Sequence, residues 1–434
     1  MKLRIGVPPD VRLLFATRIL RLLAYGFLSV VLALYLEAAG LTATQIGLLL
    51  TLTLVGDTLV SLAITTSADR LGRRRMLVVG AALMVLAGAV FASTRSFWLL
   101  LAAATVGVIS PSGYEVGPFL SIEQASLAHL LPDERRTGTF AWYNLVGSFA
   151  TAGGALASGF LVSRLQAGGL GKLGSYRVIV LVYAAIGAAL AVLFLRLTRA
   201  IEPARAPQVP PQPGAGGAQP AAGGAQLPPS SPAPRPFLGL HRSKGIVLKL
   251  SALFSLDAFA GGFVVQSLMA YWFHKRFGVQ PALLGSIFFA ANILAGVSAL
   301  SAARVARRIG LVNTMVFTHL PSNVLLMLVP LMPSLPLAIA VLLLRFAISQ
   351  MDVPTRQSYT MAVVAPDERS AASGITSVAR TTGASIAPVF TGFLLASRAL
   401  MGVPFLIAGG LKIIYDLALL ASFRGIKPPE EKKP

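Results

Sequence analysis

The sequence predicts an all-α membrane protein with twelve transmembrane helices, arranged as two six-helix bundles related by a pseudo-two-fold repeat. Three observations support this fold: the composition, a series of long apolar segments, and a Pro-rich stretch that separates two similar halves. The 434 residues are 55% hydrophobic and 12% charged, with a mean hydropathy of +0.74. Soluble domains carry about 25% charged residues, so this is the composition of a polytopic membrane protein.

Twelve apolar segments have about the 20 residues, or more, that a transmembrane helix needs. They cover residues 11–36, 44–68, 76–94, 97–130, 137–164, 176–197, 246–273, 281–303, 312–330, 335–364, 369–397 and 402–423. The first follows the basic start Met1-Lys-Leu-Arg4 but is too long for a signal peptide. We therefore expect it to be retained as the first helix.

A stretch rich in Pro, Gly, Ala and Gln interrupts the apolar pattern after the sixth segment. Such a composition cannot bury a core and predicts a disordered linker. The predicted domains are therefore an N-terminal bundle over residues 1–200, a linker over 201–244, a C-terminal bundle over 245–424 and a tail over 425–434.

Short matches indicate that the two halves are copies of one unit. Leu131-Pro-Asp-Glu-Arg135 precedes the fifth segment, and Ala365-Pro-Asp-Glu-Arg369 precedes the eleventh. Farther along, Gly159-Phe-Leu161 matches Gly392-Phe-Leu394. A repeat of this kind places the binding site between the halves, near the middle of the bilayer.

The distribution of Lys and Arg predicts the orientation. The net charge of +21 comes from short basic runs between apolar segments, such as residues 70–75 and 304–308. This pattern follows the positive-inside rule and not the footprint of a nucleic-acid binder. We expect a protein of the plasma (inner) membrane, with both termini and the linker in the cytoplasm.

Several function classes are excluded by missing residues. The chain has no cysteine and only four histidines, none of them in a His-Glu-x-x-His pattern. It also lacks a Gly-x-x-x-x-Gly-Lys phosphate-binding run. We expect no enzyme activity, no metal or other cofactor, no use of ATP and no nucleic-acid partner, and we expect a monomer.

Asp69-Arg-Leu-Gly-Arg-Arg74, between the second and third segments, is the most diagnostic motif. It resembles the signature loop of the major facilitator superfamily, although Thr65 stands where that family usually has a Gly. A weaker copy, Arg307-Arg-Ile-Gly310, lies in the second half. The alternative is an ordinary basic loop.

The resemblance covers the whole chain except the linker and implies a secondary transporter. It implies that the first, fourth, seventh and tenth helices line a central cavity. It also implies that the loop locks the cytoplasmic side during transport, with Asp69, Arg70, Gly72 and Arg73 as the gate.

The tenth segment carries charges that a membrane span does not normally contain. Arg345, Asp352 and Arg356 are spaced by seven and four residues, so they share one helix face with Ser349. A charge facing lipid costs several kcal/mol. We therefore expect this stripe to face protein or a water-filled cavity.

Three carboxylates in other segments are candidates for binding a cation or carrying a proton. Glu115 lies within 110–118, where two prolines and two glycines should break the helix, and Glu123 follows it. Asp257 lies beside the pair Gly261-Gly262 in the seventh segment. For each acid, the alternative is a structural role beside broken backbone or an Arg.

Other polar residues in the spans have less certain roles. Arg380 could pair with Asp352 or hold an anion, and Asp57 is as consistent with a buried ion pair as with transport. We expect His319 to be structural. Arg18 and Arg21 are expected to extend to the cytoplasmic surface, and Lys412 is expected to pair with Asp416, four residues away.

The sequence thus predicts a secondary transporter that works by alternating access. Glu115, Asp257 and Asp352 would meet at the cavity, with Arg345, Arg356 and Arg380 as counter-charges or anion contacts. The first choice is proton-coupled efflux (antiport) of a small organic compound, and the alternative is proton-coupled uptake (symport) of a small polar or anionic solute. A lipid-handling or sensory protein on the same fold is an alternative of another class.

Overall fold

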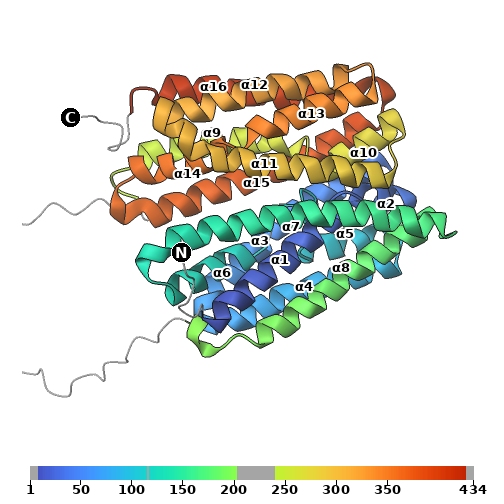
Figure 1. The fold of residues 1–434 in the computed structure, drawn as a ribbon, viewed down its shortest axis with the longest axis horizontal. Coiled ribbons are helices and arrows are strands. Elements are labelled where there is room, and N and C mark those ends of the chain that lie inside the picture. Colours follow the sequence, from blue (N-terminus) through green and yellow to red (C-terminus); the bar gives the residue numbers. More distant parts are fainter. Residues whose placement is uncertain (1–7, 115–116, 203–239, 427–434) are drawn as a thin grey trace, which may run out of the picture.

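The computed structural model describes residues 8–114, 117–202 and 240–426, which form long helices lying side by side (Figure 1). The first half contains α1 (Pro9–Ser29), α2 (Leu32–Ala38), α3 (Ala43–Leu71), α4 (Arg73–Ser93), α5 (Phe97–Val106), α6 (Phe119–Leu130), α7 (Asp133–Ala167) and α8 (Lys172–Leu195). The second half contains α9 (Lys244–Gly262), α10 (Gln266–Phe277), α11 (Pro281–Ile309), α12 (Leu311–Leu328), α13 (Leu335–Ser349), α14 (Asp352–Val363), α15 (Arg369–Leu395) and α16 (Val403–Phe423). The predicted linker lies mostly outside the described residues.

The two halves form two bundles, drawn in blue to green and in yellow to red in Figure 1. The start of α1, the end of α8, the start of α9 and the end of α16 lie at one end of the molecule, on the left of Figure 1. We call this end the linker face and the opposite end the distal face. Each half therefore begins and ends on the same side.

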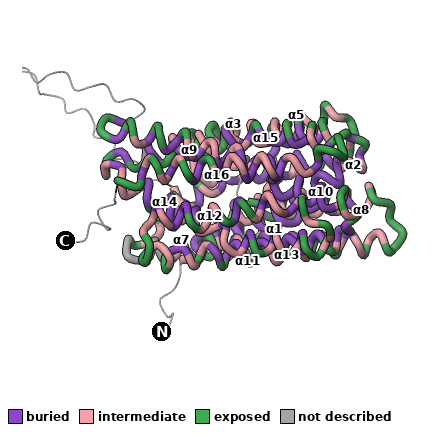
Figure 2. The backbone as a smooth tube through the Cα atoms, turned by 90° about the horizontal axis from the view of Figure 1, so that it is seen from above, coloured by how far each residue is buried: buried purple, intermediate pink, exposed green. Residues whose placement is uncertain are grey.

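The outer surface of the helices suits a lipid environment. In Figure 2, exposed positions gather at both ends of the molecule and recur along its outer sides. Many of these positions are large apolar side chains, such as Trp98, Phe393 and Leu59, which are 74%, 67% and 62% exposed. In water such a surface would be unfavourable, whereas hydrocarbon accommodates it.

The helices support most of the predicted membrane crossings. Ten helical segments in the described residues are long and apolar enough to span a membrane, and α1 with α2, bent by 46°, makes eleven. The predicted span 97–130 is the exception, because α5 has 10 residues and α6 starts only at Phe119. The prolines and glycines of 110–118 lie in this break, as predicted from their sequence.

The same kind of interruption occurs in four predicted spans: the first, fourth, seventh and tenth. These breaks separate α1 from α2, α5 from α6, α9 from α10, and α13 from α14. Two breaks satisfy each other, because the backbone N–H and the hydroxyl of Ser267 donate to the Pro111 carbonyl at 3.0 and 2.6 Å. Broken backbone inside a membrane protein needs such partners.

Two pairs of helices carry most of the packing between the bundles: α3 against α15, and α7 against α11. At each crossing, glycines let the backbones touch. A Cβ atom added at Gly159 would meet the Pro281 carbonyl oxygen at 2.3 Å, and one at Gly392 would meet Gly47 Cα at 2.7 Å. Gly159 and Gly392 are the residues that match in the sequence repeat, so the repeat marks two equivalent crossings.

The two bundles are joined on the distal side. Several hydrogen bonds between described residues of different bundles lie there, including Gln266 to Ser29 at 2.7 Å, Ala282 to Ser163 at 3.2 Å and Val389 to the Thr51 hydroxyl at 2.9 Å. Lys275 also pairs with Glu37. The structure is therefore closed at the distal face.

Glutamates anchor the chain at both edges of the linker region. Glu202 accepts from the backbone N–H groups of Arg73 and Arg74, at the N-terminus of α4. Glu368, in the second copy of the Pro-Asp-Glu-Arg motif, accepts from the N–H groups of His241, Arg242 and Ser243 at 2.6–2.8 Å. Burial raises the pKa of Glu368, but the hydrogen bonds from these N–H groups lower it by more. The resulting pKa is about 2, so the carboxylate stays charged.

Replacing Gly159 by Ala should open the distal face. The added methyl group would overlap the backbone of α11, and overpacking of this kind costs about 1–3 kcal/mol. Because the chain has no cysteine, Cys residues introduced at Ser163 and Ala282 can report closure by their rate of disulfide formation. We expect G159A to slow this cross-link.

Gly153 on the same helix provides the control, because a Cβ atom there would meet nothing within 4 Å. G153A should leave the cross-linking rate unchanged. Equal rates in G159A and G153A would contradict a closure that depends on the glycine crossing.

Candidate functional site

A cavity of about 470 Å³ lies between the two bundles. Its size is within the range of small-molecule sites. The acidic and basic lining residues are Asp57 (α3), Asp257 (α9), His319 (α12), Arg345 (α13), Asp352 and Arg356 (α14), Arg380 (α15) and Lys412 (α16). Four fixed cations therefore face three carboxylates.

The stripe on the tenth predicted span lies in the cavity wall. Arg345, Ser349, Asp352 and Arg356 all line the cavity and are 3–8% exposed. The break between α13 and α14 falls within the stripe, after Ser349. The side chains on both sides of this break nevertheless reach the same cavity.

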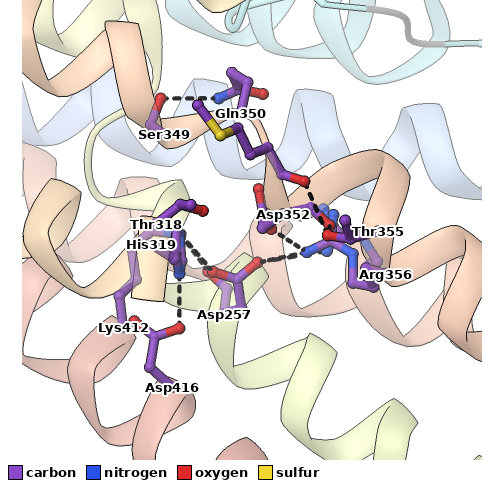
Figure 3. Close-up of polar contacts among 12 residues, drawn as sticks. Asp257, Thr318, His319, Ser349, Gln350, Asp352, Thr355, Arg356, Lys412 and Asp416 are labelled. Atoms are coloured by element: carbon purple, nitrogen blue, oxygen red, sulfur yellow. Dashed lines mark hydrogen bonds and ion pairs between the residues drawn. The ribbon is translucent and has the colours of Figure 1, made fainter. Parts of the chain in front are cut away.

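Asp257 is the centre of the charge cluster (Figure 3). Its Oδ1 accepts from Lys412 Nζ at 2.5 Å, and its Oδ2 accepts from Arg356 Nη1 at 3.2 Å and from Arg380 Nη1 at 3.4 Å. Arg356 also reaches Asp352 Oδ2 at 3.0 Å. A single carboxylate on α9 thus binds cations from α14, α15 and α16.

His319 connects this cluster to a second acid behind it. Its Nδ1 lies 2.9 Å from Asp416 Oδ1, and its Nε2 lies 4.0 Å from Asp257 Oδ1. Asn323 donates to the other oxygen of Asp416 at 2.8 Å. Asp416 is therefore held by α12, and the expected pair between Lys412 and Asp416 is replaced by the bond from Lys412 to Asp257.

These contacts identify three residues that the sequence analysis did not place at the site: His319, Lys412 and Asp416. Each is a polar residue inside an apolar span, which is the available sequence signal. A four-residue spacing made Lys412 and Asp416 look like partners. The spacing alone could not show that both side chains point to other helices.

Arg345 differs from the other cations of the cavity. Within the described residues it forms no hydrogen bond and no ion pair, and its buried Nε atom has no partner. Its guanidinium lies 4.8 Å from the centre of the Phe346 ring. The residue is only 8% exposed, although it lines the cavity.

The first bundle contributes fewer charges to the cavity. Leu54, Asp57 and Thr58 of α3 line it, together with Tyr114. The second predicted helix therefore also contributes to the cavity wall, in addition to the four helices that the resemblance implied. Glu115, the acid predicted to face the cavity from this half, lies outside the described residues.

Glu123 takes part in a different, fully buried network inside the first bundle. It accepts from Arg21 Nη1 and Nη2 at 2.7 and 2.6 Å and from Thr17 at 3.1 Å, and the Tyr143 hydroxyl also donates to it. Both Arg21 and Glu123 are 0% exposed. The expectation that Arg18 and Arg21 extend to the membrane surface is wrong, since Arg18 is only 6% exposed.

The predicted gate residues lie at the linker face. Arg73 Nε pairs with Asp69 Oδ1 at 3.0 Å, and its Nη1 donates to the Ile201 carbonyl at 3.1 Å. Gly72 has φ of +104°, a conformation that favours glycine, and Arg70 is exposed. In this state the described contacts of Arg73 stay within the first bundle.

Comparison with known sequences gives matches along nearly the whole chain. The family model described as Major Facilitator Superfamily matches residues 14–388 and 258–434. The uncharacterized membrane protein YJR124C of Saccharomyces cerevisiae is 34% identical over 433 residues, covering 98% of this chain and 96% of that protein.

Solved structures with the same fold are more distant in sequence. A bacterial homologue of the human lysosomal transporter Spinster, inward-facing and occupied, has a TM-score of 0.69 and 16% identity, over 96% of this chain and 98% of that one. The D-xylose-proton symporter has a TM-score of 0.69 and 13% identity, over 98% and 99% of the two chains. The nucleoside transporter NupG has a TM-score of 0.68 and 13% identity, over 96% and 99%.

Replacing Glu123 by Gln should destabilise the protein strongly. The change removes the carboxylate that accepts two hydrogen bonds from the buried Arg21 guanidinium, and breaking a buried ion pair typically costs about 3–5 kcal/mol. We expect a clear loss of thermal stability in detergent, and we expect the double variant R21M/E123Q to recover most of it.

The pair between Glu37 and Lys275 provides the comparison, because its side chains are 30% and 41% exposed. Exposed pairs contribute about 0–1 kcal/mol, so E37Q should have a small effect. If E123Q were no more destabilising than E37Q, the buried network would not have the structural role described here.

Proposed function

This chain belongs to the Major Facilitator Superfamily, and we propose that it is a proton-coupled symporter of a small anionic solute. Members of this family are secondary transporters that work by alternating access, and not enzymes. The chain is accordingly an integral membrane protein that transports a solute. The coupling ion, the charge of the solute and the direction of transport are the proposed parts.

The observation that carries the proposal is the shared carboxylate of Asp257. Three cations from three helices meet this one acid inside the cavity. A proton on Asp257 would remove the charge that holds them. Breaking a buried ion pair costs about 3–5 kcal/mol, and moving a two-state equilibrium from 1:99 to 99:1 takes about 5.5 kcal/mol. Protonation of this one group is therefore of the right size to drive the exchange of states.

The charges around the cavity favour an anion that enters together with a proton. Four fixed cations against three carboxylates already leave an excess of positive charge. When Asp257 takes up a proton, this excess rises by one, and an anion is attracted more strongly. Proton and anion would thus bind together, which is the requirement for symport.

His319 offers a path for the proton. Histidine is the residue type that most readily gains and loses a proton in the physiological range. The His319 ring lies between Asp416 and Asp257, so a proton received at one ring nitrogen can be matched by release from the other. Glu115 remains a proposed acid of the first half.

The closed distal face supplies one of the two states that alternating access requires. We propose that the linker face is cytoplasmic, as the basic loops predict, and that the membrane is the plasma (inner) membrane. The gate residues Asp69, Arg70, Gly72 and Arg73 would then act on the cytoplasmic side when the cavity closes there.

The test is proton-driven uptake of solute by vesicles that contain the purified protein. With the outside acidified, a panel of membrane-impermeant organic anions such as gluconate should include one that accumulates inside. D257N should reduce this gradient-driven uptake to the level of empty vesicles. Exchange of solute without a gradient should persist, because Asn imitates the protonated acid.

D10N serves as the control, because Asp10 is a buried acid that bonds to Thr198 away from the cavity. It should transport like the unmodified protein. Gradient-driven uptake that survives D257N would contradict coupling at Asp257. Loss of preloaded solute in response to the same gradient would show antiport instead, which is the efflux alternative.

A further inference from the structure

We infer that Arg345 binds the anionic group of the transported solute, and that this group is a single carboxylate. That the bound molecule is also the transported solute rests on the proposed function. The inference goes further by assigning one residue and one chemical group. The other three cations of the cavity would then be internal partners of the protein.

The pairing of the cations separates Arg345 from the rest. Lys412, Arg356 and Arg380 each reach Asp257 within 3.4 Å. Arg345 has no carboxylate oxygen of a described residue within ion-pair distance. Among the described lining residues, it is the fixed cation whose charge the protein does not neutralise by direct contact.

Burial makes this lack of a partner significant. Arg345 is 92% buried, since 8% of it is exposed, and its Nε atom is unsatisfied. A buried charge without a partner is costly, so such groups normally pair or bind a ligand. An anion in the cavity can reach this side chain, because Arg345 lines the cavity.

The geometry of the side chain favours a carboxylate. A guanidinium presents two parallel N–H groups that match the two oxygens of a carboxylate. The Phe346 ring, 4.8 Å away, lies against the guanidinium and limits its orientation. One unpaired cation balances one negative charge, so a doubly charged phosphate would be matched less well.

The rest of the wall would accommodate the organic part of the solute. Leu54, Val264 and Met269 line the cavity with apolar surface. Ser349 and Gln350, about one helical turn after Arg345, offer hydrogen-bonding groups. The cavity of about 470 Å³ has room for a small organic acid with a mixed apolar and hydroxylated body. The expected solute class is therefore a small organic monocarboxylate.

The test is equilibrium binding to the purified full-length chain in detergent, without any ion gradient. The probes are a panel of monocarboxylates from glycolate to gluconate and mandelate, the matching uncharged amides, and inorganic phosphate. We expect at least one carboxylate to bind, and its amide to bind at least about tenfold more weakly because it cannot pair with the cation. Equal binding of acid and amide, stronger binding of phosphate, or binding by no carboxylate would overturn the inference.

Variants of Arg345 locate the binding group. R345M should abolish carboxylate binding, and R345K should weaken it about tenfold, because Lys keeps the charge but loses the two-pronged geometry. Unchanged affinity in either variant would overturn the assignment. If R345M does not fold, R345K decides the question.

Thermal stability without ligand gives an independent reading. R345M should melt at the same temperature as the unmodified chain or higher, because it removes a buried charge that has no partner. R356M should melt lower, because it leaves Asp352 with no ion-pair partner and removes one from Asp257. A fall in R345M as large as in R356M would mean that Arg345 has an internal partner, which would contradict the inference.

The two proposals can fail separately. Carboxylate binding that depends on Arg345, together with transport unaffected by D257N, would refute the coupling at Asp257 and leave the anion site in place. Proton-coupled transport that is lost in D257N but unaffected in R345M would refute the anion site alone.

Discussion

A carboxylate buried among membrane helices needs positive partners, and Asp257 takes them from three other helices. Lys412, Arg356 and Arg380 reach the same two oxygen atoms. The cost of burying an isolated charge holds α9, α14, α15 and α16 together as one body. Because the Asp257 carboxylate is paired with all three cations, a change in its charge weakens all three ion pairs at once. The packing of the second bundle and its sensitivity to a proton thus have the same origin.

The two bundles divide the work between them. The described ion pairs of the cavity lie within the second bundle, whereas the first bundle presents Asp57 and a shorter set of polar groups. Between the bundles, contact is made on the distal side by glycine backbones, a few hydrogen bonds and the partly exposed ion pair of Lys275 with Glu37, whose charges water can solvate when the bundles part. Dispersion contacts between backbones can separate without leaving charges unpaired. The buried ion pairs therefore lie within the second bundle, whereas the weaker contacts lie between the two bundles, which must separate during transport.

Sequence patterns predicted the fold and the shared position of three residues of the candidate site. Apolar segments, the Pro-rich stretch and the Asp69 loop were sufficient for the family, since composition and length determine what can cross a membrane. The spacing of Arg345, Asp352 and Arg356 was sufficient to put them on one face. The choice of partner was not predictable: Lys412 turns to Asp257 and not to Asp416. Such pairings depend on how helices far apart in sequence pack together. The spacing of residues within one helix carries no information about that packing.

The distance in sequence between Asp257 and its partners has a consequence for biosynthesis. Arg356, Arg380 and Lys412 follow it by 99, 123 and 155 residues. At about 5–20 residues per second, Lys412 is made roughly 8–30 s after Asp257. During that interval α9 must enter the membrane with an acid that costs roughly 2.5–3.5 kcal/mol at the centre of a span. Of the four helices that meet at Asp257, α16 is made after the other three and supplies the last of the three cations. A chain truncated before α16 would carry an incompletely neutralised acid that quality-control machinery could recognise.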